Sequence, residues 1–308
     1  MISHGCKLSE QGVSPLKCEG QLSSGIYTLP GNITSQFISG LLFALPLLSG
    51  NSTINVTGIL ESRSYVDMTL DTLRLFGVTV LEKKQSFHIT GGQTIRSPKN
   101  VQAEGDWSNA AFWLCAGAMG KSTDSKTVAG NKVATTCTGL DLNSRQGDRA
   151  ILEILSRFGA NVVCDKDTVT VSPNELRGID IDAGDIPDLV PVLAAVAATA
   201  QGKTVIRNAA RLRMKESDRL QTVAATLSAF GADITETEDG LVIIGKKTLK
   251  GAQTHSYGDH RIAMTAAVLS TVCDGIVTIK DAHAVKKSYP AFIEDFEKVL
   301  GGSVTVNE

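Results

Sequence analysis

A short motif recurs four times along this 308-residue chain, each time just ahead of an apolar segment. Gly is followed by Asn or Asp at positions 32, 106, 185 and 259, which lie 74, 79 and 74 residues apart. Asn and Asp are common helix N-caps because their side chains accept hydrogen bonds from free N–H groups of the first turn. The segments that follow are apolar nearly all round, which is typical of helices buried on most sides. We therefore expect four buried helices, at residues 37–48, 110–119, 189–200 and 262–272.

A second, amphipathic helix is predicted later in each repeat, and each of these helices ends at a glycine. In the third repeat Leu220, Val223 and Leu227 share one face, and Gly231 fits the C′ position that closes a helix. The equivalent glycines are Gly77, Gly159 and Gly301. Short strands are predicted at 233–237, 241–244 and 275–279. Each repeat of about 75 residues is thus a β-α-β-α-β-β unit, longer than the ~20–50 residues of thin solenoid repeats.

The repeats suggest an uneven division of the chain. They begin near residues 26, 101, 181 and 255, and residues 1–25 resemble the tail of an earlier unit. We expect an α/β protein with an incomplete first domain at residues 1–103 and a second domain of three repeats at 104–308.

Composition excludes several classes of protein. The chain has 30 Lys and Arg against 32 Asp and Glu and is 42% hydrophobic, so neither disorder nor general attraction to nucleic acid is expected. No apolar run approaches the ~20 residues of a membrane span, and residues 1–17 lack a signal-peptide core. The six cysteines are scattered without a C-x-x-C pair, which argues against zinc and disulfides. A soluble cytoplasmic protein is expected.

Polar residues gather where the predicted buried helices begin. Thr34, Ser35 and Gln36 open the first, Asp188 precedes the third, and Tyr-Gly-Asp-His-Arg at 257–261 opens the fourth. Capping alone explains Asn and Asp at such positions, but Arg261 gains nothing from the positive end of a helix dipole. Arg261 is therefore expected to hold an anion.

The loops ahead of the amphipathic helices carry cations. One reads Lys-Glu-Ser-Asp-Arg at 215–219, the equivalent loop of the first repeat reads Ser-Arg-Ser-Tyr at 62–65, and that of the fourth reads Lys-Lys-Ser-Tyr-Pro at 286–290. A charge run is often only a solvated surface, since exposed ion pairs stabilise little. Recurrence at an equivalent place favours a basic site instead.

Four motifs stand in order along the chain: Thr-Ser-Gln at 34–36, Lys-Glu-Ser-Asp-Arg at 215–219, Tyr-Gly-Asp-His-Arg at 257–261 and Lys-Ser-Tyr-Pro at 287–290. Together they resemble the 5-enolpyruvylshikimate-3-phosphate (EPSP) synthase family. The resemblance runs from about residue 15 to the C-terminus. It implies the two-domain inside-out α/β barrel of the enolpyruvyl transferases, built from six β-α-β-α-β-β units, with about four of them in this chain. The family's N-terminal Lys-Ser loop and its Gly-Asn-x-Gly-Thr segment have no counterpart here, so we expect a truncated or split enzyme.

The resemblance also implies a reaction. An enolpyruvyl group moves from phosphoenolpyruvate to the 5-hydroxyl of shikimate-3-phosphate, phosphate leaves, and the product feeds aromatic amino acid biosynthesis. Asp188 would accept a proton and Glu216 would donate one; carboxylates on separate repeats suit such divided roles. The remaining implied contacts are Lys215 to shikimate-3-phosphate and to the tetrahedral intermediate, and Arg219, Arg261 and Lys287 to phosphoenolpyruvate.

Further contacts are implied for the first repeat. Ser35 would hold the 3-phosphate at a helix N-terminus, Gln36 would reach both ligands, and Thr34 replaces the family's usual Ser while keeping the hydroxyl. Ser62 would bind phosphate and Tyr65 would line the same side. His260 would orient the intermediate. The resemblance implies a monomer that acts on small molecules without metal, organic cofactor, nucleic acid or membrane.

Two alternatives stay open. The family that transfers enolpyruvyl to UDP-N-acetylglucosamine has the same fold and donor, although the motifs at 215–219 and 257–261 favour the shikimate enzyme. The chain could instead be a catalytically silent fragment that retains partial ligand binding, because missing substrate contacts remove transition-state stabilisation.

Overall fold

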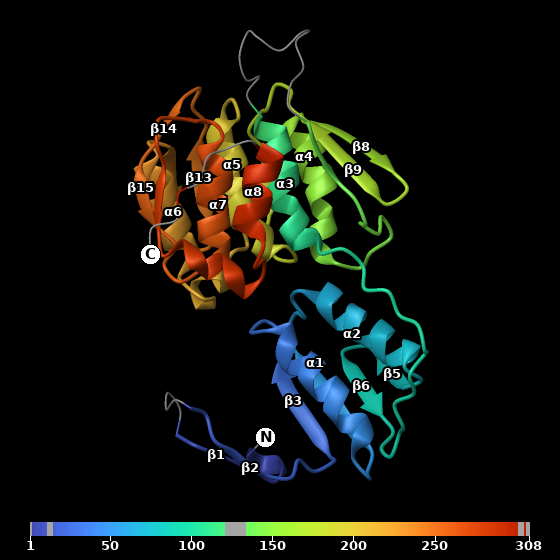
Figure 1. Ribbon diagram of the computed structural model, residues 1–308. Coiled ribbons are helices and arrows are strands. Elements are labelled where there is room, and N and C mark those ends of the chain that lie inside the picture. Colours follow the sequence, from blue (N-terminus) through green and yellow to red (C-terminus); the bar gives the residue numbers. More distant parts are fainter. Residues whose placement is uncertain (1, 11–14, 121–133, 301–304, 306–308) are drawn as a thin grey trace. The chain divides into compact units, whose positions relative to one another are not determined.

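The structure is a computed structural model that describes residues 2–10, 15–120, 134–300 and 305 (Figure 1). The chain divides into two compact units, unit 1 at Met1–Ala103 and unit 2 at Glu104–Glu308. Each unit has a hydrophobic core of its own. No helix in the described ranges has the length and apolar character needed to cross a bilayer.

Unit 1 contains a short antiparallel hairpin followed in the sequence by one full repeat. The hairpin strands are β1 (Cys6–Leu8) and β2 (Cys18–Gly20), preceded by the 3-10 turn η1 (Ile2–His4). The repeat consists of β3 (Ile26–Pro30), α1 (Ser35–Ala44), β4 (Ser52–Thr57), α2 (Arg63–Leu75), β5 (Val80–Lys83) and β6 (Ser86–Ile89). The sheet order is β3-β4-β6-β5, with β3 and β4 parallel. The order of helices and strands in this repeat matches the predicted β-α-β-α-β-β unit.

The apolar residues of this repeat meet between its sheet and its helices. Along β4 burial alternates, so that Ile54 and Val56 point inward, as expected for a strand with one covered face. From α2 come Val66 and Leu73, which join Phe87 of β6 in the same cluster. One sheet and two helices thus share a single core.

One prediction about unit 1 is wrong. The segment 37–48 does not form a helix buried on most sides: α1 ends at Ala44, the 3-10 turn η2 (Leu45–Leu47) follows, and the buried residues of α1 are Ser35, Ile38 and Leu42. Phe37 is 55% exposed and Phe43 is 45% exposed. The physical reason is that unit 1 holds a single repeat, whereas burial on most sides needs neighbouring helices of the same kind.

Unit 2 contains the three remaining repeats. The second repeat consists of α3 (Trp107–Met119), β7 (Thr135–Cys137), η3 (Gly147–Ala150), α4 (Ile151–Phe158), β8 (Asn161–Asp165) and β9 (Thr168–Ser172). The third consists of β10 (Asp180–Asp182), η4 (Pro187–Leu189), α5 (Val190–Thr199), β11 (Lys203–Arg207), η5 (Ala210–Met214), α6 (Arg219–Ala229), β12 (Asp233–Glu236) and β13 (Leu241–Ile244). The fourth consists of β14 (Leu249–Lys250), β15 (Gln253–His255), α7 (His260–Ser270), β16 (Cys273–Asp274), β17 (Thr278–Lys280), η6 (Ala282–Lys287) and α8 (Phe292–Leu300).

The sheets of unit 2 follow the repeats. Their orders are β7-β9-β8, β10-β11-β13-β12 and the parallel pairs β14-β16 and β15-β17. The third repeat has the same four-strand order as the repeat of unit 1. Residues 90–106 form neither helix nor strand, so the second repeat has no first strand of its own. The predicted strand 275–279 is wrong in its bounds, because Gly275 (φ +105°) turns the chain between β16 and β17.

The core of unit 2 is built on three buried helices. In α3, α5 and α7 nearly every residue is buried, and each of the three contacts the other two. Figure 1 shows α3 and α7 inside unit 2, with strands such as β8 and β15 toward its edges. The predicted burial on most sides is confirmed for these three helices.

The predicted glycine ends are confirmed wherever the structure describes them. Gly77, Gly159 and Gly231 all have positive φ. In each case the residue after the glycine donates to the carbonyl five positions earlier, as Ala232 N does to Leu227 O at 3.0 Å, which is the Schellman pattern. Gly301 lies outside the described residues.

Candidate active site

The predicted polar residues of unit 2 come together where its helices begin. Asp188 lies in η4 just before α5, Arg219 opens α6, and His260 and Arg261 open α7. The others follow from nearby loops: Lys215 and Glu216 after η5, and Lys287 at the end of η6. Equivalent helix starts lie at the same end of the unit because the repeats share one topology. We call these seven residues, together with Asp259, the cationic cluster.

Arg219 is the centre of the cationic cluster. Its side chain is 1% exposed, and it donates from Nη1 to Asp188, from Nη2 to Glu216 and from Nε to Asp259, each at 2.7 Å. A guanidinium can be buried only when its charge and its N–H groups are matched. Three carboxylates from three chain segments supply that match.

Asp259 ties two helices together. Its side chain is fully buried, it accepts from Arg219, and its Oδ1 caps α7 by accepting from the Arg261 backbone N–H at 2.9 Å. Ser217 donates its hydroxyl to Oδ2 at 3.1 Å. The N-cap role was predicted, but the ion pair with Arg219 was not.

Asp188 is bound by cations on both oxygens. Oδ1 accepts from Arg219, and Oδ2 accepts from Arg261 Nη2 at 3.1 Å, while Lys215 Nζ lies 3.9 Å from Oδ1. Burial by itself would raise the pKa of Asp188. The charges of Arg261, Lys215 and Arg219 outweigh it and lower that pKa to about 2. Asp188 is therefore ionised at neutral pH.

Glu216 is held in a similar way. Oε2 accepts from Arg219, and Oε1 accepts from the ammonium of Lys287. Burial opposes ionisation, but the hydrogen bond from Lys287 and the charge of Arg219 lower the pKa of Glu216 to about 2. In this structure both carboxylates are thus engaged by the cations expected to hold substrate.

Arg261 is buried but only partly satisfied. It is 7% exposed, and its Nη2 donates to Asp188 and to Ser108 Oγ, the latter at 3.2 Å. Its Nε and Nη1 are buried without a hydrogen-bond partner in the described structure. Buried donors without partners are costly, so these N–H groups are suited to an anion.

Ser108 was missed by sequence reasoning. It lies in the first turn of α3, where its hydroxyl donates to the capping carboxylate of Asp106 at 2.8 Å. Its Oγ then remains free to accept from Arg261 of α7. The Gly-Asp repeat marked Asp106 as a cap, but nothing in the sequence indicated the contact with Arg261.

His260 is almost fully buried, at 4% exposed. Burial and then the charge of Arg261 lower its pKa to about 4, so the imidazole is neutral at pH 7. Its Nδ1 lies 3.8 Å from Asp259 Oδ1. Among the described side chains, no group of three His, Cys, Asp or Glu is arranged to hold a metal ion.

The predicted residues of unit 1 form a separate set at the starts of α1 and α2. Thr34 caps α1 by accepting from the Gln36 backbone N–H at 3.2 Å, and Ser35 is buried while the Gln36 side chain is exposed. Ser62 is the N-cap residue of α2, in a left-handed conformation (φ 51°), and Tyr65 is half-buried. The loops before the two helices are joined by the bond from Glu61 N to Gly31 O, at 3.2 Å.

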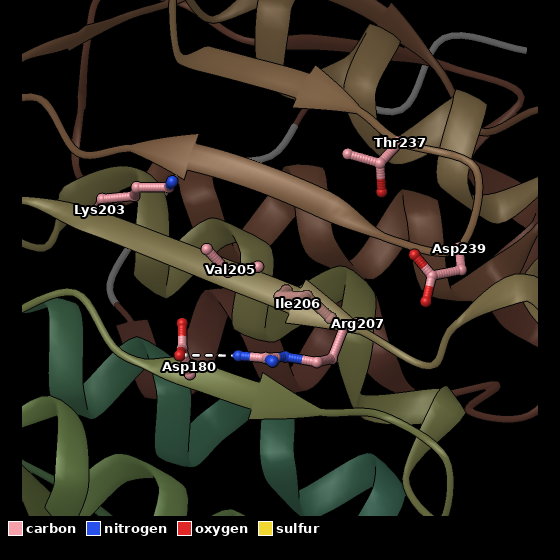
Figure 2. A pocket seen from close by; sticks show the side chains of 7 residues that line it. All are labelled: Asp180, Lys203, Val205, Ile206, Arg207, Thr237 and Asp239. Atoms are coloured by element: carbon pink, nitrogen blue, oxygen red, sulfur yellow. Dashed lines mark hydrogen bonds and ion pairs between the residues drawn. The ribbon is translucent and has the colours of Figure 1, made fainter.

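A surface hollow of about 610 Å³ lies on the sheet of the third repeat, and none of the predicted site residues lines it. Figure 2 shows its side chains, among them the ion pair of Asp180 and Arg207 at 2.7 Å. Both partners are more than half exposed, so the pair is worth little. Nothing in this hollow indicates chemistry.

Comparison with known proteins decides the family. The chain matches the EPSP synthase (3-phosphoshikimate 1-carboxyvinyltransferase) family over residues 4–296. The chain belongs to the EPSP synthase family. It is 47% identical over 297 residues to a 3-phosphoshikimate 1-carboxyvinyltransferase of Clostridium kluyveri, and 47% identical over 296 residues to one of Clostridium acetobutylicum. These alignments cover 96% of the chain but 66% and 65% of the relatives, so the chain spans just under two thirds of their length.

Solved structures agree with this membership of the EPSP synthase family. An EPSP synthase from Acinetobacter baumannii superposes with a TM-score of 0.77 at 27% identity, covering 97% of this chain and 68% of that one. The enolpyruvyl transferase NikO from Streptomyces tendae has a TM-score of 0.71 at 20% identity, covering 97% and 69%, which shows likeness of fold alone. The predicted α/β fold of the enolpyruvyl transferases is confirmed.

Proposed function

We propose that this chain carries the phosphoenolpyruvate-binding and proton-transfer residues of an EPSP synthase. The reaction would move an enolpyruvyl group from phosphoenolpyruvate to the 5-hydroxyl of shikimate-3-phosphate and release phosphate. The observation that carries the proposal is the cationic cluster, in which Lys215, Arg219, Arg261 and Lys287 face three carboxylates. The four cations leave an excess of positive charge for anionic substrates.

Arg261 supports the binding of phosphoenolpyruvate. Its two buried N–H groups without partners would gain hydrogen bonds from a phosphate or carboxylate oxygen. Lys287, 53% exposed, can present its ammonium to the same ligand as a point charge. Arg219, by contrast, is saturated by carboxylates, so its proposed contact with phosphoenolpyruvate is best supported as a charge rather than as a free donor.

The carboxylates divide the proton transfers. Asp188 would take the proton of the 5-hydroxyl, and Glu216 would give a proton to the methylene carbon of phosphoenolpyruvate. Both are joined through Arg219, which donates from Nη1 to Asp188 and from Nη2 to Glu216. Lys215 would contact shikimate-3-phosphate, and neutral His260 would orient the intermediate.

Unit 1 would supply contacts to shikimate-3-phosphate. Ser35 at the start of α1 and Ser62 at the start of α2 are suited to a phosphate, because helix N-termini present free N–H groups. Gln36 would reach both ligands, Thr34 would keep its capping role, and Tyr65 would line the same side. We also propose a cytoplasmic monomer that needs no metal or organic cofactor.

A second candidate follows from the length of the chain. Since it spans 65–66% of these two relatives, it could bind ligands without turning them over. The test is phosphate release from phosphoenolpyruvate and shikimate-3-phosphate. It is run with the chain alone and with the chain plus the part of the Clostridium kluyveri relative that it does not cover. Release in the mixture supports the proposed function; binding without release in either sample supports the silent fragment.

A further inference from the structure

The proposed function makes Glu216 a proton donor and Lys287 a ligand of the substrate anion, yet in the structure the two side chains form an ion pair. Lys287 is assigned to the substrate anion, but its ammonium contacts Glu216 Oε1. We propose that Glu216 is an internal competitor for the anion: binding of an anion takes Lys287 from Glu216, and the released carboxylate takes up a proton. This inference rests on the proposed function and deepens it, because the proton taken up is the one that Glu216 later donates.

The geometry makes Lys287 the group that an anion can take. Among the described residues its only ion-pair partner is Glu216, and its side chain is 53% exposed. Arg219 is 1% exposed and bound by three carboxylates, so it stays in place. An anion therefore competes for the outer cation of Glu216 and leaves the inner one.

The same series of ion pairs ends in two groups that can bind an anion. Arg261 is joined to Arg219 through Asp188, and Arg219 is joined to Lys287 through Glu216. The unpartnered N–H groups of Arg261 lie at one end of this series of ion pairs, and the ammonium of Lys287 lies at the other. Because the Arg261 donors are buried, an anion that reaches them is desolvated and gains from a second cation.

Loss of Lys287 changes the charges that face Glu216. The charged groups that face Glu216 are Arg219 from α6, Lys287 from η6 and Asp188 from η4, which also accepts a hydrogen bond from Arg219. His260 from α7 faces it too but is neutral at pH 7. Without Lys287, burial and the added negative charge of the ligand both favour the protonated carboxyl. The step is balanced by one proton from solvent, which binds the freed Oε1; no other bond changes.

Sulfate is the probe for the test, because it carries no titrating group near neutral pH. Calorimetry on the full 308-residue chain at pH 6, in two buffers of different ionisation enthalpy, gives the affinity and the protons taken up per sulfate. We expect net proton uptake in the unaltered chain. In Glu216→Gln we expect about tenfold tighter binding, or ~1.4 kcal/mol, and no uptake.

Two further variants keep the test specific. Glu236→Gln is the matched control, since Glu236 is also paired with an arginine, Arg213, but outside the cationic cluster; it should leave sulfate affinity unchanged. In a Lys287→Met background, Glu216→Gln should tighten binding by less than threefold, because the competition is already removed.

The outcomes separate the two proposals. Unchanged or weaker sulfate binding in Glu216→Gln, equal tightening in Glu236→Gln, or no sulfate binding in any variant overturns the internal competitor. Tightening without proton uptake in the unaltered chain overturns the proton step. The expected sulfate results together with absent phosphate release in the turnover assay would leave the competition for Lys287 standing. They would remove the proposed function and, with it, the later donation of this proton by Glu216.

Discussion

Arg219 donates from Nε to Asp259 Oδ2 at 2.7 Å, and both side chains are closed off from solvent, at 1% and 0% exposed. This pair joins the start of α6 to the start of α7. Neither partner can be removed without leaving the other charge buried. The stability of the cationic cluster therefore depends on Asp259, although Asp259 has no assigned contact with substrate.

Asp259→Ala should strongly destabilise unit 2. Removing one partner of a buried ion pair costs up to about 3–5 kcal/mol. Arg219 keeps Asp188 and Glu216, but its Nε–H, the Ser217 hydroxyl and the Arg261 backbone N–H all lose their acceptor. Urea unfolding measures the loss. Asp180→Ala is the matched control, because Asp180 pairs with Arg207 at the same 2.7 Å but with both side chains more than half exposed. We expect less than about 1 kcal/mol there, and equal losses in the two variants would contradict the prediction.

Ser108→Ala should weaken anion binding without unfolding the chain. The change removes the hydroxyl that accepts from Arg261 and leaves a further N–H contact of that buried guanidinium unmade. Hydrogen bonds to charged groups contribute roughly 1.5–3 kcal/mol. Without this one the Arg261 guanidinium is no longer held in place by α3, so phosphoenolpyruvate affinity should fall by about tenfold. Calorimetry checks this against Ser156→Ala, whose hydroxyl donates only to Leu152 O within α4. Unaltered affinity in Ser108→Ala would show that Arg261 needs no support from α3.

Stability should fall as the pH drops from 6.5 toward 4, through His260. Its folded pKa of about 4 lies below the ordinary 6.5, so in this window the unfolded chain binds a proton that the folded chain does not. The loss should reach roughly 2 kcal/mol, after allowance for relaxation around the ring. His260→Gln should flatten the slope of unfolding free energy against pH, whereas His283→Gln, at a side chain 75% exposed, should not. An unchanged slope in His260→Gln would be the contrary result.

Glu216 should add a second acid-sensitive window. Its folded pKa is lowered to about 2 from 4.5, so its contribution is present above pH 4.5 and is lost as the pH falls from there toward 2. Glu216→Gln should remove this part of the pH dependence, as followed by thermal unfolding across that range. Glu236→Gln serves again for comparison. A full acid slope in Glu216→Gln would place the titration elsewhere in the cluster.

Two substitutions in α1 should differ sharply. Leu42 is fully buried in the unit 1 core, so Leu42→Ala should cost about 2–5 kcal/mol. Phe37 is 55% exposed, so Phe37→Ser should stay within about 1 kcal/mol. Denaturant unfolding of the full chain measures both. Similar costs would mean that the apolar face of α1 is covered in solution.

Local features of the fold were the predictable ones. The helix ends at Gly159 and Gly231 depend on a left-handed residue, and on a hydrogen bond from the next residue back into the last turn. Both requirements involve only residues within a few positions of the glycine, so the sequence is enough to predict them. The apolar pattern of 189–200 likewise led to the buried α5. The same pattern failed at α1, because burial depends on what surrounds a helix and not on its own residues alone.

The sequence predicted which residues form the candidate site better than it predicted the contacts among them. Arg261 was marked because a cation is unfavourable at a helix start, and in the described structure two of its N–H groups are buried without a hydrogen-bond partner. The contact of Arg261 with Ser108 joins residues 153 positions apart, and no spacing rule covers such a distance. The pairing of Glu216 with Lys287 was not predicted either, since the sequence gives charges but not which charges meet.

The mutual contact of α3, α5 and α7 sets unit 2 apart from linear repeat proteins. In a linear array the outermost repeats have one neighbour and fray first, so unfolding proceeds in stages. Here each repeat borders both of the others, and the bond from Arg261 to Ser108 links the fourth repeat to the second. Such an arrangement has no outermost member, so we expect the three repeats to lose their structure in one step.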